Sequence, residues 1–262
     1  MSMKKMVIAP LAAALIVFSG AAHAAKDVKN AKDETNQVLE ELHKINPAAP
    51  IDAVSKTDID GIYEVVMNSQ IFYFHPKTKT LFFGEMIRDK KSLTAERKAQ
   101  IQALLTQALP LDKALKIGNG PISIVAFDDP DCPFCRKADA WLKNRQDVTL
   151  YIFMYPLPMH ADAPKKARNI LCSQNPAETF RETMAGKWDK TFSLPAGCEA
   201  KVNAVLDEHI KWGHKLGVTG TPAFWINGVG VAGADMERIE GILKQSAAGK
   251  TAETAPKDSP KK

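Results

Sequence analysis

Apolar positions in the first third of the chain predict a small mixed unit. Val38, Leu42 and Ile45 have helical spacing, so a short helix should end before residue 46. Three runs rich in β-branched and aromatic residues predict strands over Gly61–Met67, Ile71–His75 and Leu81–Ile87. Such a small antiparallel meander buries little surface by itself. We therefore expect it either to pack on the rest of the chain or to pair with a second copy.

The next stretch predicts a single helix. Ser92 or Thr94 is placed to cap it, and its apolar face ends near Ala108, before Leu109-Pro110. It contains no cysteine and no cluster of polar side chains. We therefore assign residues 91–116 to a linker helix between two domains.

From Pro121 onward the pattern changes to alternating strands and helices. The expected elements are strands over Ile122–Phe127 and Val148–Met154, a helix between them from about Pro133 to Arg145, a polar helical stretch over Ala161–Leu216, a hairpin of Ala223–Ile226 and Val229–Val231 around Asn227-Gly228, and a closing helix with Met236, Ile239 and Leu243 on one face. This is the order of a thioredoxin-like domain with a helical insertion. We predict an α+β fold, with a catalytic domain over 117–248 and a small N-terminal α+β domain over 25–90.

Both ends of the chain lack the pattern of a folded domain. Lys4 and Lys5 precede an apolar run over Val7–Phe18, and Ala22-His23-Ala24 is a small-x-small cleavage site. Residues 1–24 therefore predict a signal peptide with a mature chain from Ala25, the alternative being an uncleaved anchor. Residues 249–262 are mainly Ala, Pro, Lys and Glu, which predicts a disordered tail.

Charge and cysteine content narrow the functional classes. The 262 residues carry a formal charge of +5 with scattered Lys and Arg, so we expect no nucleic-acid partner. All four cysteines follow the predicted cleavage site. A signal peptide implies export to an oxidising compartment, here the periplasm, where cysteines pair or stay redox-active.

One motif carries a specific chemistry. Cys132-Pro133-Phe134-Cys135 lies where a buried strand meets a helix N-terminus. Unpaired backbone N–H groups and the helix dipole favour a thiolate at the first cysteine. Pro133 suits the first helical turn, where a missing N–H costs nothing. We predict that Cys132 is the nucleophile and that Cys135 is the resolving thiol.

Two other features of this turn are open from sequence. Asp128, Asp129 and Asp131 oppose the thiolate if they point toward the sulfur. The motif is also half of a zinc site, although Cys172 and Cys198 are too far apart to supply the matching pair. We favour redox chemistry, with no metal and no other cofactor.

Thr221-Pro222 precedes a predicted strand, a position where a proline often only shapes the loop. In a thioredoxin-like domain this position holds a cis-proline that faces the two cysteines. The exposed backbone of Thr221 then lets an extended substrate add as a short strand. We expect Thr221 and Pro222, with Pro133 and Phe134, to bind substrate.

Cys172 and Cys198 are assigned to a structural disulfide, with a second redox pair as the alternative. The closed loop counts 27 residues with both ends. By the loss of chain entropy in the unfolded state, a disulfide that closes this loop should stabilise the fold by roughly 3–4 kcal/mol. His160 and the four tryptophans could line a substrate groove, but we favour packing roles for them. This preference is weakest for His160. The tryptophans are Trp141, Trp188, Trp212 and Trp225.

Several motifs together resemble the DsbC/DsbG family of periplasmic disulfide isomerases. They are Ile124–Phe127 before the acidic turn, Cys132–Cys135, Met184-Ala185-Gly186-Lys187, the Cys172/Cys198 pair and Leu216–Ala223. The resemblance covers nearly the whole mature chain. It departs at Pro133-Phe134, where DsbC-like members usually have Gly-Tyr and DsbG-like members Pro-Tyr, so a hydroxyl donor is missing.

The resemblance implies a V-shaped homodimer joined through the N-terminal domains. Its cleft would hold misfolded or wrongly disulfide-bonded exported proteins. A DsbD-like membrane thiol reductase would keep Cys132 and Cys135 reduced.

Three functions are therefore compared. The favoured one is a disulfide isomerase and reductase. The alternatives are a DsbG-like reductase of sulfenylated single cysteines, to which Pro133 leans, and a chaperone or secretion accessory that only holds clients. A thiol oxidase ranks low because it would most naturally be monomeric and lack the N-terminal unit.

Overall fold

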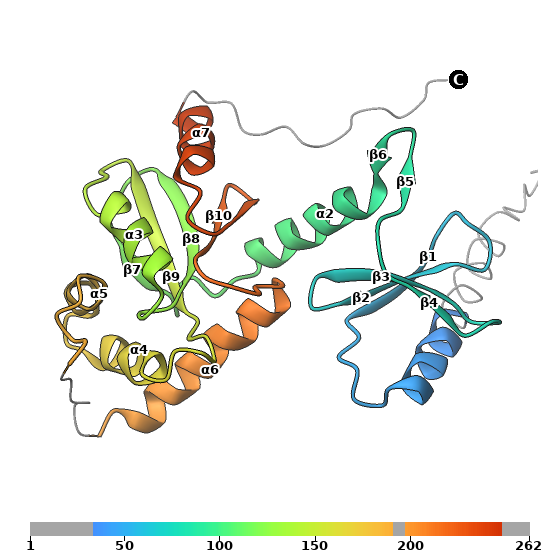
Figure 1. The fold of residues 1–262 in the computed structure, drawn as a ribbon, viewed down its shortest axis with the longest axis horizontal. Coiled ribbons are helices and arrows are strands. Elements are labelled where there is room, and N and C mark those ends of the chain that lie inside the picture. Colours follow the sequence, from blue (N-terminus) through green and yellow to red (C-terminus); the bar gives the residue numbers. More distant parts are fainter. Residues whose placement is uncertain (1–33, 191–196, 248–262) are drawn as a thin grey trace, which may run out of the picture.

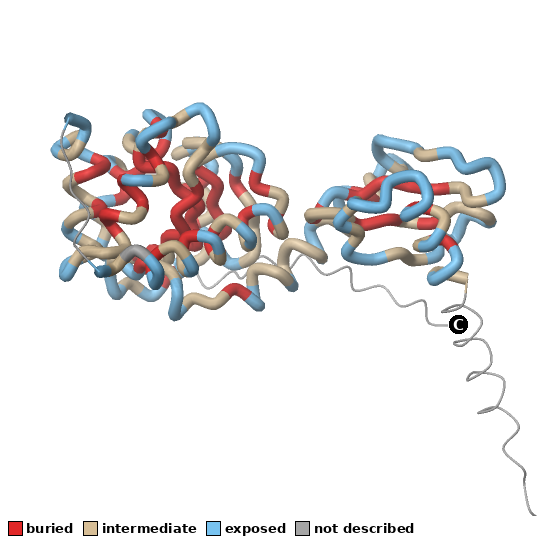
Figure 2. The backbone as a smooth tube through the Cα atoms, turned by 90° about the horizontal axis from the view of Figure 1, so that it is seen from below, coloured by how far each residue is buried: buried red, intermediate tan, exposed pale blue. Residues whose placement is uncertain are grey.

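A fifteen-residue helix, α2 (Leu93–Gln107), joins two separately packed units (Figure 1). The computed structural model describes residues 34–190 and 197–247. The predicted signal peptide and tail lie outside the described residues. Buried residues concentrate in the sheet of each unit (Figure 2). Each unit therefore has its own hydrophobic core.

The N-terminal unit is a four-stranded antiparallel sheet in the order β1-β2-β3-β4, as the meander predicted. Its strands are β1 (Ala53–Lys56), β2 (Tyr63–Met67), β3 (Gln70–His75) and β4 (Thr80–Phe82). The predicted first helix spans described residues 34–45 and packs Val38 and Leu42 against Val65 and Phe74, while Ile45 is exposed. The opposite face buries Ile71 and its neighbours, so both sides of the sheet are covered.

The prediction of one strand over Leu81–Ile87 is wrong in its second half. β4 ends at Phe82, and Gly84 follows with a φ of 146°, which favours glycine. Residues Ile87–Arg88 (β5) then pair with Lys91–Ser92 (β6) in a separate hairpin. The apolar side chains of Phe82, Phe83 and Ile87 point to solvent rather than to a core. The apolar run over Leu81–Ile87 therefore corresponds to an exposed surface and not to one buried strand.

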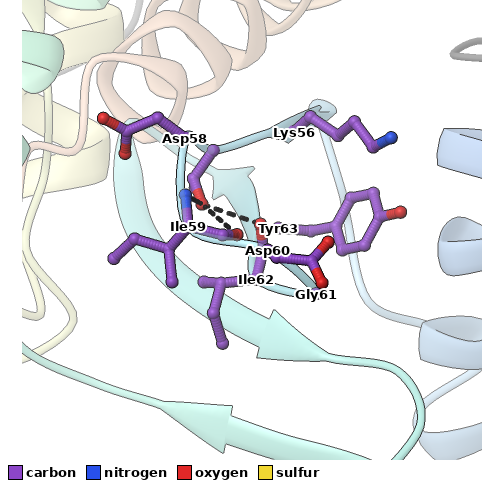
Figure 3. A pocket seen from close by; sticks show the side chains of 8 residues that line it. Lys56, Asp58, Ile59, Asp60, Gly61, Ile62 and Tyr63 are labelled. Carbon is purple, nitrogen blue, oxygen red and sulfur yellow. Dashed lines mark hydrogen bonds between the residues drawn. The ribbon is translucent and has the colours of Figure 1, made fainter.

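The connection between β1 and β2 encloses a pocket of about 240 Å³, lined by residues 56–63 (Figure 3). The Thr57 hydroxyl accepts a hydrogen bond from the Ile59 N–H at 3.2 Å and donates one to the Ile62 carbonyl at 2.8 Å. These bonds hold the loop in place. The pocket belongs to the N-terminal unit, whereas both free thiols lie in the C-terminal unit.

The linker helix contacts both units. Ser92 caps it by accepting a hydrogen bond from the Ala95 N–H, whereas Thr94 is buried and binds the Tyr73 hydroxyl. Ile101 packs on the N-terminal core and Leu105 on the C-terminal one. The helix therefore acts as a packed connector.

The C-terminal unit is built on a five-stranded sheet in the order β11-β10-β8-β9-β7. Its strands are β7 (Leu115–Ile117), β8 (Ile122–Asp128), β9 (Val148–Met154), β10 (Ala223–Ile226) and β11 (Val229–Ala232). Only β8 and β9 are parallel. Ile124 and Ala126 face one core while Val125 and Phe127 face the other, as the alternation of a strand requires.

Helices cover both faces of this sheet. They are α3 (Pro133–Leu142), α4 (Ala163–Cys172), α5 (Pro176–Met184), α6 (Glu199–Lys215) and α7 (Met236–Ala247). α3 ends before the predicted Arg145. α4 to α6 form the predicted helical insertion. The thioredoxin-like order is confirmed, and β7, in the stretch assigned to the linker, is an additional edge strand.

Candidate active site

Backbone hydrogen bonds place the two thiols at the junction of β8 and α3. β8 ends at Asp128, and Cys132 is the N-cap of α3 with Pro133 in its first turn. The Cys132 N–H donates to the Asp129 carbonyl at 3.1 Å. The Cys132 carbonyl accepts from the Arg136 N–H at 3.1 Å, as an N-cap carbonyl does. The predicted strand–CxxC–helix arrangement is present.

Strand pairing brings the proline loop to the thiols. In the antiparallel register of β10 and β8, Ala223 lies opposite Phe127. Pro222 therefore stands level with the end of β8, directly beside the start of the CxxC turn. The Thr221–Pro222 peptide bond is cis, as expected.

Cys132 is more enclosed than the sequence suggested. Both thiols are free, and Cys132 is only 3 % exposed. Its Sγ donates a hydrogen bond to the Thr221 carbonyl at 3.3 Å. Phe134 is 62 % exposed. A group that reaches the Cys132 sulfur would therefore have to displace this contact with Thr221.

Cys135 lies deeper than Cys132. Its sulfur accepts a hydrogen bond from the Asp129 N–H at 3.4 Å. Burial raises the pKa of the Cys135 thiol strongly, and the nearby Asp128 carboxyl raises it further. The Cys135 thiol therefore stays protonated at neutral pH unless a base takes its proton.

A buried acid stands next to that thiol. Burial raises the pKa of Asp128 to about 7, and the hydrogen bond with Cys135 opposes that rise. Asp139 and Asp129 raise the pKa of Asp128 further, while Arg181 lowers it. Within the described residues its Oδ1 has no hydrogen-bond partner. Asp128 is therefore a carboxyl that exchanges a proton near neutral pH.

Asp129 organises the turn before Cys132. Its side chain is fully buried. Oδ1 accepts from the Asp131 N–H at 2.7 Å, and Oδ2 accepts from the Leu157 N–H at 2.6 Å. His160 Nδ1 lies 2.9 Å from Oδ2. Asp129 therefore connects the CxxC turn to the loop after β9, and His160 is one of its contacts from that loop.

Asp131, which directly precedes Cys132 in the chain, belongs to a cluster of charges. Lys166, from α4, contacts both Asp131 and Asp189. Arg136, from the first turn of α3, contacts the same two carboxylates. Sequence reasoning named Asp131 but not Lys166, Arg136 or Asp189.

The remaining predicted residues lie as follows. Cys172 and Cys198 are joined by a disulfide between the end of α4 and the start of α6. Trp225 is buried, while the other three tryptophans are half-buried beneath the cations Arg145, Lys187 and Lys215. These contacts support packing roles for the tryptophans. The described residues contain no group of three or more His, Cys, Asp or Glu side chains that could hold a metal ion.

Two protein families match this chain. Residues 20–95 match the disulfide bond isomerase protein N-terminal domain, and residues 110–251 match the thioredoxin-like domain. The first match covers the unit with the antiparallel meander. The second covers the unit with both thiols and the cis-proline loop.

Named relatives agree with these matches. A probable thiol:disulfide interchange protein DsbC of Bordetella pertussis is 31% identical over 190 residues, which are 70% of this chain and 64% of the relative. That of Bordetella avium is 30% identical over 187 residues, covering 70% and 62%. The chain thus spans less than two thirds of the length of these relatives. The thiol:disulfide interchange protein DsbG of Escherichia coli is 27% identical over 111 residues, covering 41% and 44%.

A solved structure is also similar. The disulfide interchange protein from Neisseria gonorrhoeae has 32% sequence identity, and the match covers 52% of this chain and 97% of that chain with a TM-score of 0.45.

Proposed function

Because the chain belongs to the thioredoxin-like family and carries the N-terminal domain of disulfide bond isomerases, we propose that it is a protein disulfide isomerase and reductase. The observation that carries the proposal is the contact of Cys132 with the carbonyl of Thr221 at the N-terminus of α3. This contact supports the assignment of Cys132 as the nucleophile and of the Thr221 backbone as the segment that would align a substrate.

Exchange begins at Cys132. Its thiolate attacks one sulfur of a non-native disulfide, forms a mixed disulfide and releases the other substrate sulfur as a thiolate. In isomerisation, a different substrate thiolate then attacks the mixed disulfide and returns Cys132 to its thiolate form. In reduction, Cys135 attacks Cys132 instead, and the substrate leaves with both of its sulfurs reduced.

The reductive branch needs a base for Cys135. The Asp128 carboxylate accepts the proton of the Cys135 thiol, and the new thiolate attacks Cys132. The leaving substrate thiolate then takes a proton from the Asp128 carboxylic acid or from water. One disulfide is broken in the substrate and one is formed between Cys132 and Cys135.

Substrate contacts surround Cys132. Pro133 and Phe134 are exposed, and Thr221 is half-buried on the other side of the sulfur. An extended segment that pairs with the Thr221 backbone would lay an apolar side chain on Phe134. We propose misfolded or wrongly disulfide-bonded exported proteins as the substrates.

The N-terminal unit supports a homodimer. Phe82, Phe83 and Met86 line an open groove of about 280 Å³ on this unit, and Phe83 is 78 % exposed. Exposed apolar side chains of this size mark interaction surfaces. Sedimentation velocity on the full chain should give a dimer, and Phe83→Asp should shift it toward monomer; a wild-type monomer at micromolar concentration would contradict the dimer.

The N-terminal residues support a periplasmic location. The basic start, the short apolar run and the Ala22-His23-Ala24 site support a cleaved signal peptide. No helix in the described part of the chain has the length and apolar character needed to cross a bilayer. A DsbD-like membrane thiol reductase would return Cys132 and Cys135 to the reduced state.

Scrambled ribonuclease tests the proposed activity. The wild type should restore ribonuclease activity, and Cys132→Ala should not. Cys135→Ser should accumulate mixed disulfides at Cys132. Recovery no better than that of Cys132→Ala would remove the isomerase function.

A sulfenic-acid reductase is the second candidate, and Pro133 directly after Cys132 favours it. Proteins captured by Cys135→Ser decide between the two. Clients with several disulfides support the isomerase, whereas clients with a single cysteine support the reductase of sulfenic acids. Client protection that persists in Cys132→Ala/Cys135→Ala would support a chaperone instead.

A further inference from the structure

Four charged side chains form a closed cluster that flanks the CxxC motif, since Asp131 directly precedes Cys132 and Arg136 directly follows Cys135. Lys166 Nζ lies 2.5 Å from Asp131 Oδ1 and 2.7 Å from Asp189 Oδ1. Arg136 donates to both oxygens of Asp189, at 2.8 and 2.6 Å, and to Asp131 Oδ1 at 3.3 Å. Two cations thus alternate with two carboxylates.

The cluster is held in place by its surroundings. The Lys166 side chain is only 4 % exposed, so its ammonium is removed from water. Arg136 Nε also donates to the Pro130 carbonyl at 3.0 Å, which fixes its guanidinium against the turn before Cys132. A buried, paired lysine that lost its partners would be costly, so these pairs define the arrangement.

A glycine makes the approach of Asp189 possible. Gly186 has a φ of 85°, and a Cβ there would lie 3.0 Å from Asp189 Oδ2 and 3.9 Å from Arg136 Nη1. The Asp189 N–H donates back to the Gly186 carbonyl at 3.3 Å. The turn after α5 therefore needs glycine to bring Asp189 onto Arg136.

The charge balance has a consequence for the thiol. Asp131 precedes Cys132 directly, so an unpaired carboxylate at this position would oppose negative charge on the sulfur. The neighbouring charged or titratable groups are Asp129, which accepts the Asp131 N–H, His160, which contacts Asp129, Cys135, and the buried Asp128 beside Cys135. Asp128 is unchanged in every variant of the test below, so its own titration is common to all the profiles. Lys187 is engaged by Glu182 outside the cluster.

We propose that Lys166 and Arg136 are positioning residues that neutralise Asp131 and hold its carboxylate in the cluster, and thereby set how readily Cys132 ionises. The proposal rests on the proposed function, because the ionisation of Cys132 matters only if Cys132 is the reacting thiol. Asp189 completes the cluster by giving both cations a second partner. The helical insertion thus contributes to the redox site through α4 and the turn after α5.

The test is the pH profile of alkylation at Cys132. All variants carry Cys135→Ser in the full-length protein, and the rate with iodoacetamide is followed from pH 4 to pH 9. Lys166→Met keeps the apolar stem and leaves Asp131 less compensated, so alkylation at pH 6 should be about fivefold slower and the profile should move to higher pH. Adding Asp131→Asn should restore the original profile.

A variant of opposite sign separates charge from structural loosening. Asp189→Asn leaves two cations for one carboxylate, so alkylation at pH 6 should be about twofold to fivefold faster. Asp189 is 39 % exposed, so this variant should fold even if Lys166→Met does not. An unchanged profile in Asp189→Asn, the same direction of change in both variants, or no rescue by Asp131→Asn would overturn the proposal.

This result is independent of the activity assay. If the wild type fails to restore scrambled ribonuclease while the two variants still shift alkylation in opposite directions, the proposed isomerase is wrong and the cluster stands. If ribonuclease is restored but the alkylation profiles coincide, the cluster proposal is wrong and the isomerase stands.

Discussion

Three acids in one turn have three different environments. Asp128 is buried beside Cys135, Asp129 binds backbone N–H groups, and Asp131 is paired with cations. The sequence shows all three within four positions but not which way each points. Their directions depend on partners from α4 and the loops after β9 and α5, which are brought together only by the fold.

The pH dependence of stability tests the environment of Asp128. Burial raises its pKa from 3.8 to about 7, so the folded state binds a proton more tightly than the unfolded state. The stability from this group is present below about pH 4 and is lost as pH rises through 7. Asp128→Asn should therefore gain stability over the wild type with rising pH, on the order of 4 kcal/mol above pH 7.

Urea unfolding of both proteins at pH 4.5 and pH 8 measures this difference. Asp139, whose pKa is also raised by burial, is present in both proteins. Because the two carboxyls interact, the part of the Asp139 titration that depends on the charge of Asp128 stays in the difference, and the rest cancels. A difference between variant and wild type that is the same at both pH values would show that Asp128 does not titrate in this range.

His209 should give the opposite slope. Its Nδ1 accepts from the Met154 N–H at 3.0 Å, so the ring is neutral and its Nε2–H donates to the Lys113 carbonyl at 2.9 Å. Burial lowers the pKa of His209, so the stability from its neutral ring is full above about pH 6.5 and falls below it. The destabilisation caused by His209→Gln should therefore be larger at pH 8 than at pH 5.

Urea unfolding of His209→Gln and the wild type at pH 5 and pH 8 measures how much the substitution lowers the free energy of unfolding at each pH. A cost that stays constant between pH 5 and pH 8 would mean that the imidazole keeps the same charge in the folded and unfolded states.

At the scale of elements, long apolar runs were predictive and short ones were not. β9 coincides with its predicted run, and β8 differs from it only by adding Asp128, because apolar residues fill nearly every position of a strand covered on both faces. β1 and β7 are short strands in which polar residues stand among apolar ones, so neither has a clear apolar run. They form because a neighbouring strand offers backbone hydrogen bonds. Phe82 and Phe83 misled the prediction because they are apolar but exposed.

The candidate site was predictable where its parts are local. The cysteines, the helix start and Pro222 are each marked by a short motif. Lys166 and Asp189 could not be foreseen, because the sequence holds many lysines and aspartates and the pairing depends on how α4 packs. The signal that was available was Gly186, whose purpose becomes clear only with its φ of 85°.

The insertion depends on its disulfide. Cys172 and Cys198 join the end of α4 to the start of α6, with a sequence separation of 26. Removing this link with Cys172→Ser/Cys198→Ser should lower the free energy of unfolding by about 3.5 kcal/mol, because the unfolded chain regains loop freedom. The CxxC is untouched, so Cys132 alkylation provides the folding control.

Urea unfolding of the double serine variant against the wild type gives this number. Thiol titration of the denatured wild type after mild reduction should find two reactive thiols, those of Cys132 and Cys135. Four thiols would mean that the Cys172–Cys198 link is as labile as a redox pair and would revive the alternative of a second active pair.

At the scale of the whole molecule, the two units touch beyond the linker helix. The β2–β3 turn places Ser69, which is buried, against the end of α6, where its hydroxyl donates to the Lys215 carbonyl at 2.5 Å. Gln102 of α2 donates to the next carbonyl, that of Leu216, at 3.3 Å. The end of α6 is thus capped by both the N-terminal unit and the linker.

This contact lies close in sequence to the redox site. Gly217 follows Leu216, the C-cap residue of α6. A Cβ on Gly217 would lie 3.0 Å from the Asn68 carbonyl, so the two backbones meet closely. Thr221 and Pro222 come four and five positions later. A change in how the N-terminal unit docks would therefore act on the chain that leads into the cis-proline loop.

Ser69→Ala tests the docking. Loss of the buried hydroxyl should weaken the contact by about 1–2 kcal/mol and speed hydrogen exchange in the segment from Gly213 to Pro222. Thr183→Val is the matched control, because the buried Thr183 hydroxyl also donates to a helix carbonyl, that of Thr179, but within α5. Faster exchange after the first change and not after the second would show that the N-terminal unit stabilises the loop facing Cys132; equal exchange in all three proteins would show that the two units are joined through α2 alone.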